Sequence, residues 1–557
     1  MSGSLALIEA LKKQNVKIIF GIPGGAILPI YDALYDERDI RHILMRHEQC
    51  AAHAADGYAR VKGEPGVCMA TSGPGATNLV TGIATAYMDS SPLIAITGQV
   101  PTSFIGKDAF QEVDIIGITT PITKYNYQIR NVKDIPKIIQ EAFYIASSGR
   151  PGPVLIDIPK DIQTSIDDMS FDSEIKIRGY KLNLDPHPLQ IKKAVGFLIN
   201  AERPIILAGG GIHWAKAYDE LLMLAELLFA PVTTTFMGKG AIPENHPLCL
   251  GCIGMHGRIE ANEAIMMADV VLSIGVRFSD RSTCKVDDFC TNAKIIHIDI
   301  DPSEIKKNVS IHLPIVADAK KALRLIIDEL IHRGLKKEKS EWLKKIEMLK
   351  KDNADTEPEG ELTGMNAVKL LRKVLPEDSI VTTEVGQNQM WASLYFKVLK
   401  PRTFISSGGL GTMGFGFPAA LGAKVAKPNV PVVDIAGDGS FLMTEQDLAT
   451  SIVEDIPVIV MILNNSSLGM VVQWQRLFYN RRYSNTILKS VPDFVKLAEA
   501  YGAKGSRVSS LNELEQALKE AIKSDVTYVI DVPVSSEEDV LPFVPPGKNL
   551  REIIFKR

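Results

Sequence analysis

The sequence predicts an α/β protein of several domains, in which helices cover parallel sheets. Three observations support this prediction. Segments with helical periodicity alternate with short apolar runs along most of the chain. The length of 557 residues suits about three domains. The clearest unit, residues 432–465, reads as a strand, a helix that continues through Glu454 and a second strand, which is the size of one parallel βαβ unit.

Residues 432–465 also carry the most specific chemical signal in the chain. The first strand ends at the Gly-Asp-Gly-Ser run 437–440, and the second ends at Asn464 and Asn465. Both strands should end at the same sheet edge, so Asp438 and Asn465 should lie side by side. Their oxygens suit Mg²⁺, and the flanking glycines let backbone approach a diphosphate. Gly-Asp-Gly alone would fit a plain strand-to-helix turn, but the paired asparagine favours a site for a metal and a diphosphate.

The composition argues against several other classes of protein. Hydrophobic residues make up 46% and charged residues 23% of the chain, as in soluble globular proteins. The formal net charge of -4 argues against a nucleic-acid partner. No apolar run approaches the roughly 20 residues that span a bilayer, and the N-terminus lacks the regions of a signal peptide. We therefore expect a cytoplasmic protein that binds neither nucleic acid nor membrane.

The six cysteines are too few for a disulfide framework in a chain of this length. Cys249 and Cys252 form a CxxC pair, but no second pair at zinc-like spacing accompanies it, and both lie in an apolar, Gly-rich segment. The ten histidines form no HExxH or HxH cluster. We interpret both cysteines as packing residues and expect no transition-metal site.

Residues 1–165 are the first predicted α/β domain. Its first strand runs into the Pro-Gly-Gly turn 23–25. A helix of small residues, 51–60, permits close packing of another element. Residues 72–78 open a further helix, whose free N–H groups form a cradle for an anion or a polar ligand.

Residues 186–332 are the second predicted domain, reached through a connector that contains proline and charged residues. Its strands end in glycines at 209–211, in Arg277 and Asp280, and in Asp299. Aspartate and arginine at several strand ends suit the ribose and diphosphate of a nucleotide. The glycine run alone is weak evidence, because the spaced third glycine of the dinucleotide fingerprint is missing.

Residues 361–557 are the third predicted domain. The charged segment 335–360 precedes it, and because acids interleave with its lysines we interpret it as a charged helix in a solvated linker. Residues 407–414 formally contain GxGxxG. Only a short extended segment precedes them and a Gly-rich helix follows, which argues against a dinucleotide site.

Taken together, the motifs resemble those of the thiamine-diphosphate-dependent enzymes, and within them the catalytic (large) subunits of acetohydroxyacid synthase, also called acetolactate synthase. The resemblance covers nearly all of the chain. It rests on GDG…NN (437–465), RHEQ…AAHAADGYAR (46–60), TSGPGATN (71–78), GRPGPV (149–154), GVRFSDR (275–281), SSGGLGTMGFGFPAA (406–420) and GMVVQWQ (469–475).

The resemblance implies three doubly wound parallel-sheet domains and three cofactors: thiamine diphosphate, Mg²⁺ and FAD. Residues 1–165 would bind the pyrimidine of thiamine diphosphate, residues 186–332 would form a Rossmann-like FAD domain, and residues 361–557 would bind the diphosphate and Mg²⁺. It also implies a homodimer or homotetramer, with each thiamine diphosphate between the first domain of one chain and the third domain of its neighbour. A separate regulatory small subunit is a further possible partner.

The implied activity is that of an acetolactate synthase, in the first common step of valine, leucine and isoleucine biosynthesis. Pyruvate is decarboxylated on thiamine diphosphate, and the two-carbon unit is transferred to a second pyruvate or to 2-ketobutyrate. The alternatives within the superfamily are a ketoacid decarboxylase, a glyoxylate carboligase or an FAD-linked pyruvate oxidase. A non-catalytic cofactor-binding subunit is the alternative of another class, and the intact Glu48, Asp438 and Asn465 argue against it.

The resemblance assigns roles to several side chains. Glu48 would pair with a pyrimidine ring nitrogen, and burial would suit that role; without the resemblance it reads as an acid at a helix start. Met413 would hold the cofactor in its bent shape, although a methionine among glycines is more often a packing residue. Ser467 would complete the Mg²⁺ site of Asp438 and Asn465 through its backbone carbonyl.

Further residues follow from the same resemblance. The acceptor pocket would include Phe110, Met255 and Trp474, with Arg281 pairing the acceptor carboxylate and Gln111 and Lys124 lining the channel. Other thiamine diphosphate contacts would be Pro23, Gly24, Gly25, Thr71, Gly73, Asn78, Gln387, Asn388, Gly411, Gly437, Gly439, Ser440 and Met470. FAD contacts would be Arg150, Gly209, Gly210, Gly211, Met255, His256, Arg277, Asp280, Arg281, Asp299 and Asp318.

A few positions depart from the family pattern. Ile22 stands where a tyrosine is usual, Glu384 where an aspartate is usual and Asn388 where a histidine is common. Residues 102–103 replace a basic residue, and Pro546 replaces a small one. None removes a chemical group from the expected mechanism, but all border the cofactor or the channel, so they bear on acceptor preference and inhibitor sensitivity.

Overall fold

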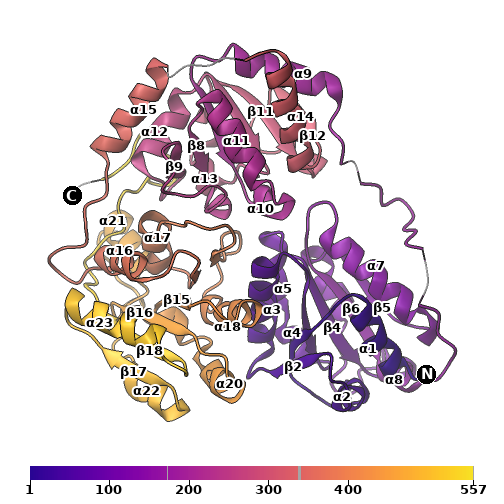
Figure 1. Cartoon of the computed structure of the whole chain (residues 1–557). Coiled ribbons are helices and arrows are strands. Elements are labelled where there is room, and N and C mark those ends of the chain that lie inside the picture. Colours follow the sequence, from indigo (N-terminus) through magenta and orange to yellow (C-terminus); the bar gives the residue numbers. More distant parts are fainter. Residues whose placement is uncertain (172–173, 183, 336–339, 556–557) are drawn as a thin grey trace.

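The structure is a computed structural model that describes residues 1–171, 174–182, 184–335 and 340–555. In this part of the chain, three six-stranded parallel sheets form the centres of three α/β domains (Figure 1). The predicted fold class is therefore confirmed. No helix of the described residues is long and apolar enough to cross a membrane.

The first domain has the strand order β2-β1-β3-β4-β6-β5. Its strands are β1 (Ile18–Gly21), β2 (Arg41–Leu44), β3 (Gly66–Ala70), β4 (Leu93–Gln99), β5 (Tyr125–Gln128) and β6 (Val154–Pro159). Its helices are α1 (Gly3–Lys13), α2 (Leu28–Tyr35), α3 (Glu48–Lys62), α4 (Pro74–Asn78), α5 (Val80–Met88), α6 (Ile115–Thr119), α7 (Ile135–Ser147) and α8 (Lys160–Thr164).

The second domain has the strand order β12-β11-β10-β7-β8-β9, which is the order of a Rossmann domain. Its strands are β7 (Pro204–Ala208), β8 (Val232–Thr234), β9 (Cys249–Cys252), β10 (Val270–Ile274), β11 (Lys294–Asp299) and β12 (Leu313–Val316). Its helices are α9 (Pro188–Ile199), α10 (Gly211–Ala215), α11 (Tyr218–Leu228), α12 (Ile259–Met267), α13 (Asp280–Thr283), α14 (Ala319–His332) and α15 (Glu341–Asp352).

The third domain repeats the strand order of the first, as β14-β13-β15-β16-β18-β17. Its strands are β13 (Ile380–Thr383), β14 (Phe404–Ser406), β15 (Val432–Gly437), β16 (Ile459–Asn464), β17 (Lys504–Arg507) and β18 (Tyr528–Pro533). Its helices are α16 (Gly364–Val374), α17 (Gln387–Tyr395), α18 (Gly416–Ala426), α19 (Asp438–Phe441), α20 (Leu448–Val453), α21 (Gly469–Phe478), α22 (Phe494–Tyr501) and α23 (Leu511–Ile522).

The small-residue helix of the first domain packs tightly against the third domain, as its composition predicted. A side chain at Gly57 of α3 would collide with the Ala419 carbonyl of α18, and one at Gly422 would collide with the Ala54 carbonyl. Side chains from both domains consequently share one hydrophobic core. Figure 1 shows α3 and α18 side by side at the seam between the two domains.

Two segments differ from the sequence prediction. The helix predicted to run through Glu454 is broken into α19, a 3-10 turn (Glu445–Asp447) and α20, because Thr444 leaves the helical conformation (φ -142°). The segment 335–360 is only partly a solvated linker: Trp342 of α15 is buried and donates a hydrogen bond to the Pro204 carbonyl oxygen at 3.0 Å. An amphipathic helix therefore packs on the second domain where charge alone suggested a free linker.

Candidate active site

The second and third domains together line a cavity of about 560 Å³, here called the anchor cavity. It lies at the carboxyl ends of β15 and β16, where open α/β sheets bind ligands. The lining includes all of the residues predicted for thiamine diphosphate and Mg²⁺ in the third domain: Gln387, Asn388, Gly411, Met413, Gly437, Asp438, Gly439, Ser440, Asn465, Ser467 and Met470.

Asp438 and Asn465 come together in the anchor cavity, as their strand ends predicted. The Asp438 side chain is 1% exposed, and its Oδ2 has no hydrogen-bond partner among the described residues. Burial raises the Asp438 pKa to about 6. Asn465 Oδ1 accepts hydrogen bonds from the Ser467 N–H at 3.1 Å and hydroxyl at 2.9 Å. A buried carboxylate oxygen without a partner, in a cavity that the Asn465 amide also lines, fits the chemistry of a small hard cation.

Side chains of α17 and α21 brace the same cavity. Asn465 Nδ2 donates to Gln387 Oε1 at 3.0 Å, and Gln387 Nε2 donates to Gln473 Oε1 at 3.0 Å. Asn388 Nδ2 donates to the Ile435 carbonyl oxygen at 2.7 Å. Gln387 and Asn388 thus hold the loop after β16 and the end of β15 in place.

Arg281 and Trp474 also line the anchor cavity. The Arg281 guanidinium lies 5.7 Å from the centre of the Trp474 ring, and Arg281 Nη1 contacts Met255 Sδ at 3.2 Å. Burial, with a smaller contribution from the Arg281 charge, lowers the His256 pKa to about 3. The cavity lining therefore combines a flat aromatic surface with a neighbouring cation, an arrangement suited to a small carboxylate with an alkyl group.

The predicted site residues of the first domain gather elsewhere. Glu48 begins α3, and its Oε2 accepts a hydrogen bond from Asn78 Nδ2 at 2.9 Å. A side chain at Gly24 would lie 2.5 Å from Thr71 Cγ2, and the Thr71 hydroxyl accepts from the Ala26 N–H at 3.2 Å. Among the described residues, none from 1–165 lines the anchor cavity. Glu48 is half-buried in this chain rather than fully buried.

Phe110, Gln111 and Lys124 follow the same division. Phe110 is 88% exposed, and Gln111 lies over Gly73, where a side chain would meet the Gln111 carbonyl oxygen at 2.8 Å. Lys124 Nζ donates to the carbonyl oxygens of Ile145 and, at 2.7 Å, Ser148. Burial lowers the Lys124 pKa to about 8. None of the three is among the described residues that line the anchor cavity.

A second cavity, of about 390 Å³ and here called the seam cavity, lies where all three domains meet. The strand ends of β7, β10 and β11 open into it, as the sequence predicted for a nucleotide site. Of the predicted FAD contacts it is lined by Arg150, Gly210, Gly211, Arg277, Arg281, Asp299 and Asp318. Met255, His256 and Asp280 line the anchor cavity instead, and Gly209 packs so closely on Gly275 that a side chain there would collide.

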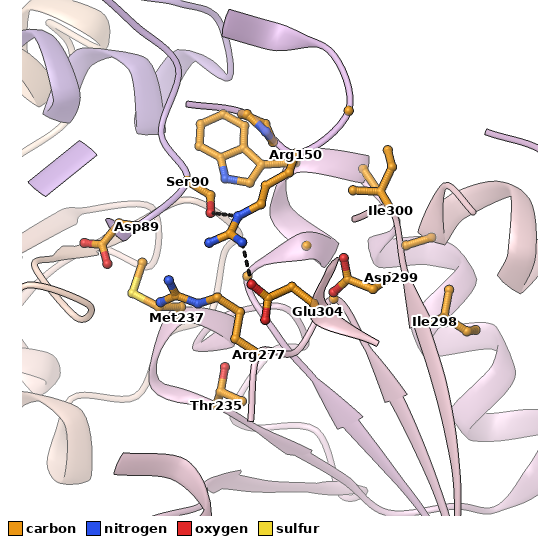
Figure 2. Close-up of a pocket in the computed structure, with 18 of the residues that line it drawn as sticks. Asp89, Ser90, Arg150, Thr235, Met237, Arg277, Ile298, Asp299, Ile300 and Glu304 are labelled. Carbon is orange, nitrogen blue, oxygen red and sulfur yellow. Dashed lines mark hydrogen bonds and ion pairs between the residues drawn. The ribbon is translucent and has the colours of Figure 1, made fainter. Parts of the chain in front are cut away.

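Ion pairs join the first and second domains across the seam cavity (Figure 2). Arg150 Nε donates to Ser90 Oγ at 2.8 Å, and its Nη1 donates to Glu304 Oε1 at 2.6 Å. Arg277 of the second domain donates a hydrogen bond to the Met88 carbonyl oxygen of the first domain. Two cations thus line the seam cavity. The seam cavity adjoins the anchor cavity, because both are lined by Phe236, Ile253, Arg281 and Gly408.

Several residues that line these cavities were not predicted from the sequence. Asp89, Ser90, Trp214 and Glu304 line the seam cavity, and Phe236 lines both. Each belongs to a segment without a recognisable motif, and only domain packing brings it to the cavity. Glu384, noted as a departure, is fully buried and accepts from the N–H groups of Gly414 at 2.7 Å and Phe417 at 3.1 Å, beside the cavity residue Met413.

Comparison with known proteins gives consistent assignments. Three family profiles match successive parts of the chain: the thiamine pyrophosphate enzyme N-terminal TPP binding domain (1–118), the central domain (191–326) and the C-terminal TPP binding domain (384–532). A probable acetolactate synthase large subunit of Methanocaldococcus jannaschii is 54% identical, covering 100% of this chain and 95% of its own length. One from Methanococcus aeolicus is 52% identical, with the same coverage.

More distant relatives carry the same name. An acetolactate synthase large subunit of Corynebacterium glutamicum is 46% identical over 100% of this chain and 90% of its own length. The three profiles follow one another in the order of the three sheets. The chain belongs to the acetolactate synthase large subunits, a family of thiamine pyrophosphate enzymes.

Proposed function

We propose that the protein decarboxylates pyruvate on thiamine diphosphate and transfers the two-carbon unit to a second pyruvate or to 2-ketobutyrate. The observation that carries the proposal is the anchor cavity, whose lining includes a buried Asp438 oxygen without a hydrogen-bond partner together with Arg281 and Trp474. The Asp438 oxygen fits a metal-bound diphosphate, and the Arg281–Trp474 pair fits a small 2-ketoacid. The relatives' names as acetolactate synthase large subunits support the same activity.

We propose that Asp438, Asn465 and the Ser467 carbonyl hold Mg²⁺. When bound, thiamine diphosphate supplies a nucleophilic carbon that accepts the electrons released by decarboxylation. Glu48 would hold a proton against a pyrimidine nitrogen, and its hydrogen bond from Asn78 fixes the direction of the carboxyl. Met413, half-buried between Gly411 and Gly414, would support the bent cofactor.

Arg281 and Trp474 would select the acceptor substrate. Arg281 would pair the acceptor carboxylate, and the flat Trp474 ring would contact its alkyl group. A contact to one methylene is worth only about 1–3 kcal/mol, so we expect a finite preference for 2-ketobutyrate over pyruvate. Met255 contacts Arg281 and would restrict the direction of its guanidinium.

We propose that the seam cavity binds FAD in a structural role, because the overall reaction involves no net oxidation or reduction. Arg150 and Arg277 would face its diphosphate, and the residues shared between the two cavities would let its far end approach the anchor cavity. Asp318 would contact FAD from the start of α14. It caps this helix, because its side chain accepts a hydrogen bond from the Lys321 N–H at 2.9 Å.

We also propose a homodimer or homotetramer whose active sites lie between chains. Glu48, Asn78, Phe110 and Gln111 of one chain would complete the anchor cavity of its neighbour, because in the described part of a single chain they lie outside it. The functional units would be residues 1–165, 186–332 and 361–557. A separate small subunit would be a partner for regulation.

One assay tests the proposed activity. The purified chain is incubated with thiamine diphosphate, Mg²⁺, FAD and pyruvate, and the products are separated. We expect acetolactate, and we expect the Asp438→Ala variant to form none while keeping the circular dichroism spectrum of the unaltered chain. Free acetaldehyde without acetolactate would contradict the synthase assignment and indicate a simple decarboxylase.

A further inference from the structure

The segment 406–412 is the wall between the anchor cavity and the seam cavity. Gly408 lines both cavities, and Met413 of the anchor cavity follows directly after the segment. The segment belongs to the third domain, but α5 of the first domain holds it. Thr85 and Thr412 share a hydrogen bond between their hydroxyls at 2.7 Å. Whatever moves α5 would therefore move a wall of both cavities.

Asp89, the residue after α5, makes the strongest of these contacts. Its carboxylate accepts hydrogen bonds from the N–H groups of Gly408 at 3.1 Å and Gly409 at 2.6 Å. Its side chain is buried and also lines the seam cavity (Figure 2). A charged acceptor with two backbone donors forms stronger bonds than a neutral one, so Asp89 fixes the position of this wall.

Arg60 of α3 completes the clamp from the other side. Its Nη1 donates to the Ser406 carbonyl oxygen at 2.8 Å, and its Nη2 donates to Asp89 at 3.0 Å. Asp56 pairs with Arg60 through two hydrogen bonds of 2.7 Å and, among the described residues, makes no hydrogen bond to the segment itself. Burial disfavours the charge of Arg60, but Asp56 and Asp89 outweigh burial, so its pKa lies above its ordinary value.

The two glycines leave no room for adjustment. A side chain at Gly409 would lie 2.7 Å from Asp89 Oδ1 and 2.8 Å from the Met88 carbonyl oxygen. A side chain at Gly408 would collide with Met237 Sδ and would lie 2.8 Å from Phe236, both of the second domain. All three domains thus meet on two residues: Gly409 packs on the Asp89 carboxylate and the Met88 backbone, and Gly408 packs on side chains of the second domain.

We infer that Asp89 is a positioning residue that couples the two cavities: a ligand in the seam cavity holds the Asp89 clamp and thereby the Met413 wall of the anchor cavity. The inference rests on the proposed function for the identity of the two ligands. It gives the flavin a task in a reaction without net redox chemistry. The coupling is reciprocal, because each ligand must change the affinity of the other by the same factor.

The test is a double titration of the full-length protein. The dissociation constant of thiamine diphosphate, at fixed Mg²⁺, is measured by isothermal titration calorimetry with and without saturating FAD. We expect FAD to tighten thiamine diphosphate binding on the order of 10-fold in the unaltered protein. In Asp89→Asn the factor should fall close to one, because the amide cannot accept from both glycine N–H groups and also pair with Arg60.

Asp56→Asn is the matched control. It removes a buried carboxylate that pairs with the same Arg60, but it leaves both bonds of Asp89 to the segment, so coupling should persist. Coupling that survives in Asp89→Asn, or that disappears equally in Asp56→Asn, would overturn the inference. If Asp89→Asn does not fold, the same titration is carried out on Gly409→Ala. The added methyl group disrupts the contact between Gly409 and Asp89 but leaves every charge in place. Coupling of unaltered size in Gly409→Ala would also overturn the inference.

Failure of the inference is distinguishable from failure of the proposed function. A chain that forms acetolactate but binds FAD and thiamine diphosphate independently refutes the coupling and leaves the activity. A chain that binds neither ligand refutes both. Titration of FAD with and without thiamine diphosphate provides the reciprocal check, since a different factor in that direction contradicts a coupling between two binding sites.

Discussion

The seam cavity and the anchor cavity differ in how many domains of the chain build them. The seam cavity is lined by residues of all three domains, from Asp89 and Arg150 through Asp299 to Gly408. The anchor cavity is lined, within the described residues, only by the second and third domains. The difference supports the proposal that one chain builds the cavity for FAD by itself, whereas the anchor cavity would be completed by a second copy.

The largest effects are expected at Glu48 and Asp438, which would belong to different chains in each proposed active site. Glu48→Ala should lower acetolactate formation on the order of 100- to 10,000-fold, the range for a lost proton-transfer group. Asp438→Ala should also be inactive. When the two variants are co-expressed in equal amounts, random pairing gives one intact site in half of the dimers, so about a quarter of the activity should return.

The control for this experiment places both substitutions in one chain, co-expressed with the unaltered chain. In each mixed dimer, both active sites then carry one substitution, so only dimers of two unaltered chains should be active. If Glu48 and Asp438 instead served one site within a chain, co-expression of the single variants would restore nothing. Activity would be measured per mole of purified protein, with the subunit ratio determined by mass spectrometry.

A smaller effect is expected at the cavity that one chain completes. Arg150→Ala should lower FAD affinity on the order of 10-fold or more, because it removes a cation and leaves the buried Glu304 without its 2.6 Å partner. Flavin absorbance after gel filtration measures the loss. Arg150→Lys keeps the charge without the planar fork and should lie in between. Glu48→Ala should leave FAD affinity unchanged, and an equal loss there would remove the distinction between the cavities.

A still smaller change is expected at the acceptor wall of the anchor cavity. Trp474→Leu should lower the preference for 2-ketobutyrate over pyruvate by about 10-fold or less, because leucine keeps part of the apolar contact to a methylene that is worth about 1–3 kcal/mol in full. Competition between the two acceptors, with both products quantified, measures it. Tyr479, which follows the same helix and is 63% exposed, supplies the control: Tyr479→Leu should keep the preference. An unchanged ratio in Trp474→Leu would exclude this wall as the acceptor pocket.

The smallest effect concerns carboxyl groups behind the anchor cavity. Glu304 of the seam cavity pairs with Arg150, but Glu384 lies fully buried, and burial raises its pKa from an ordinary 4.5 to about 7. Burial, and then the charge of Glu384, raises the pKa of the neighbouring Asp434 as well. Between about pH 4.5 and about pH 7 the folded state therefore binds more protons than the unfolded state. The free energy of unfolding should fall as the pH rises through this range.

Glu384→Gln should therefore flatten the dependence of the unfolding free energy on pH between about 4.5 and about 7. Urea unfolding at a series of pH values measures the slope. Asp434→Asn should flatten the same window, because the two carboxyls titrate as a pair. A slope that neither substitution alters would show that the proton of this pair does not contribute to the stability of the folded state.

Much of the candidate site could be predicted because its signals are local. Asp438 and Asn465 follow adjacent parallel strands, and parallel strands end at one sheet edge, so their proximity follows from the βαβ unit alone. Glycines, Arg277 and Asp299 after the strands of the second domain predicted a nucleotide-type cavity by the same reasoning. The small residues of α3 predicted a tight helix contact, although not that α18 would be the partner.

The remaining features depend on packing between domains. The sequence by itself determined the three sheets and the chemical groups at each strand end, because hydrophobic periodicity and turn residues act over short distances. Only the tertiary structure decided that Asp89 meets Gly409, that Glu304 meets Arg150 and that Glu48 lies outside the anchor cavity of its own chain. Such contacts join residues more than 150 positions apart in the sequence, and they depend on how closely whole domain surfaces fit, which no short sequence pattern encodes.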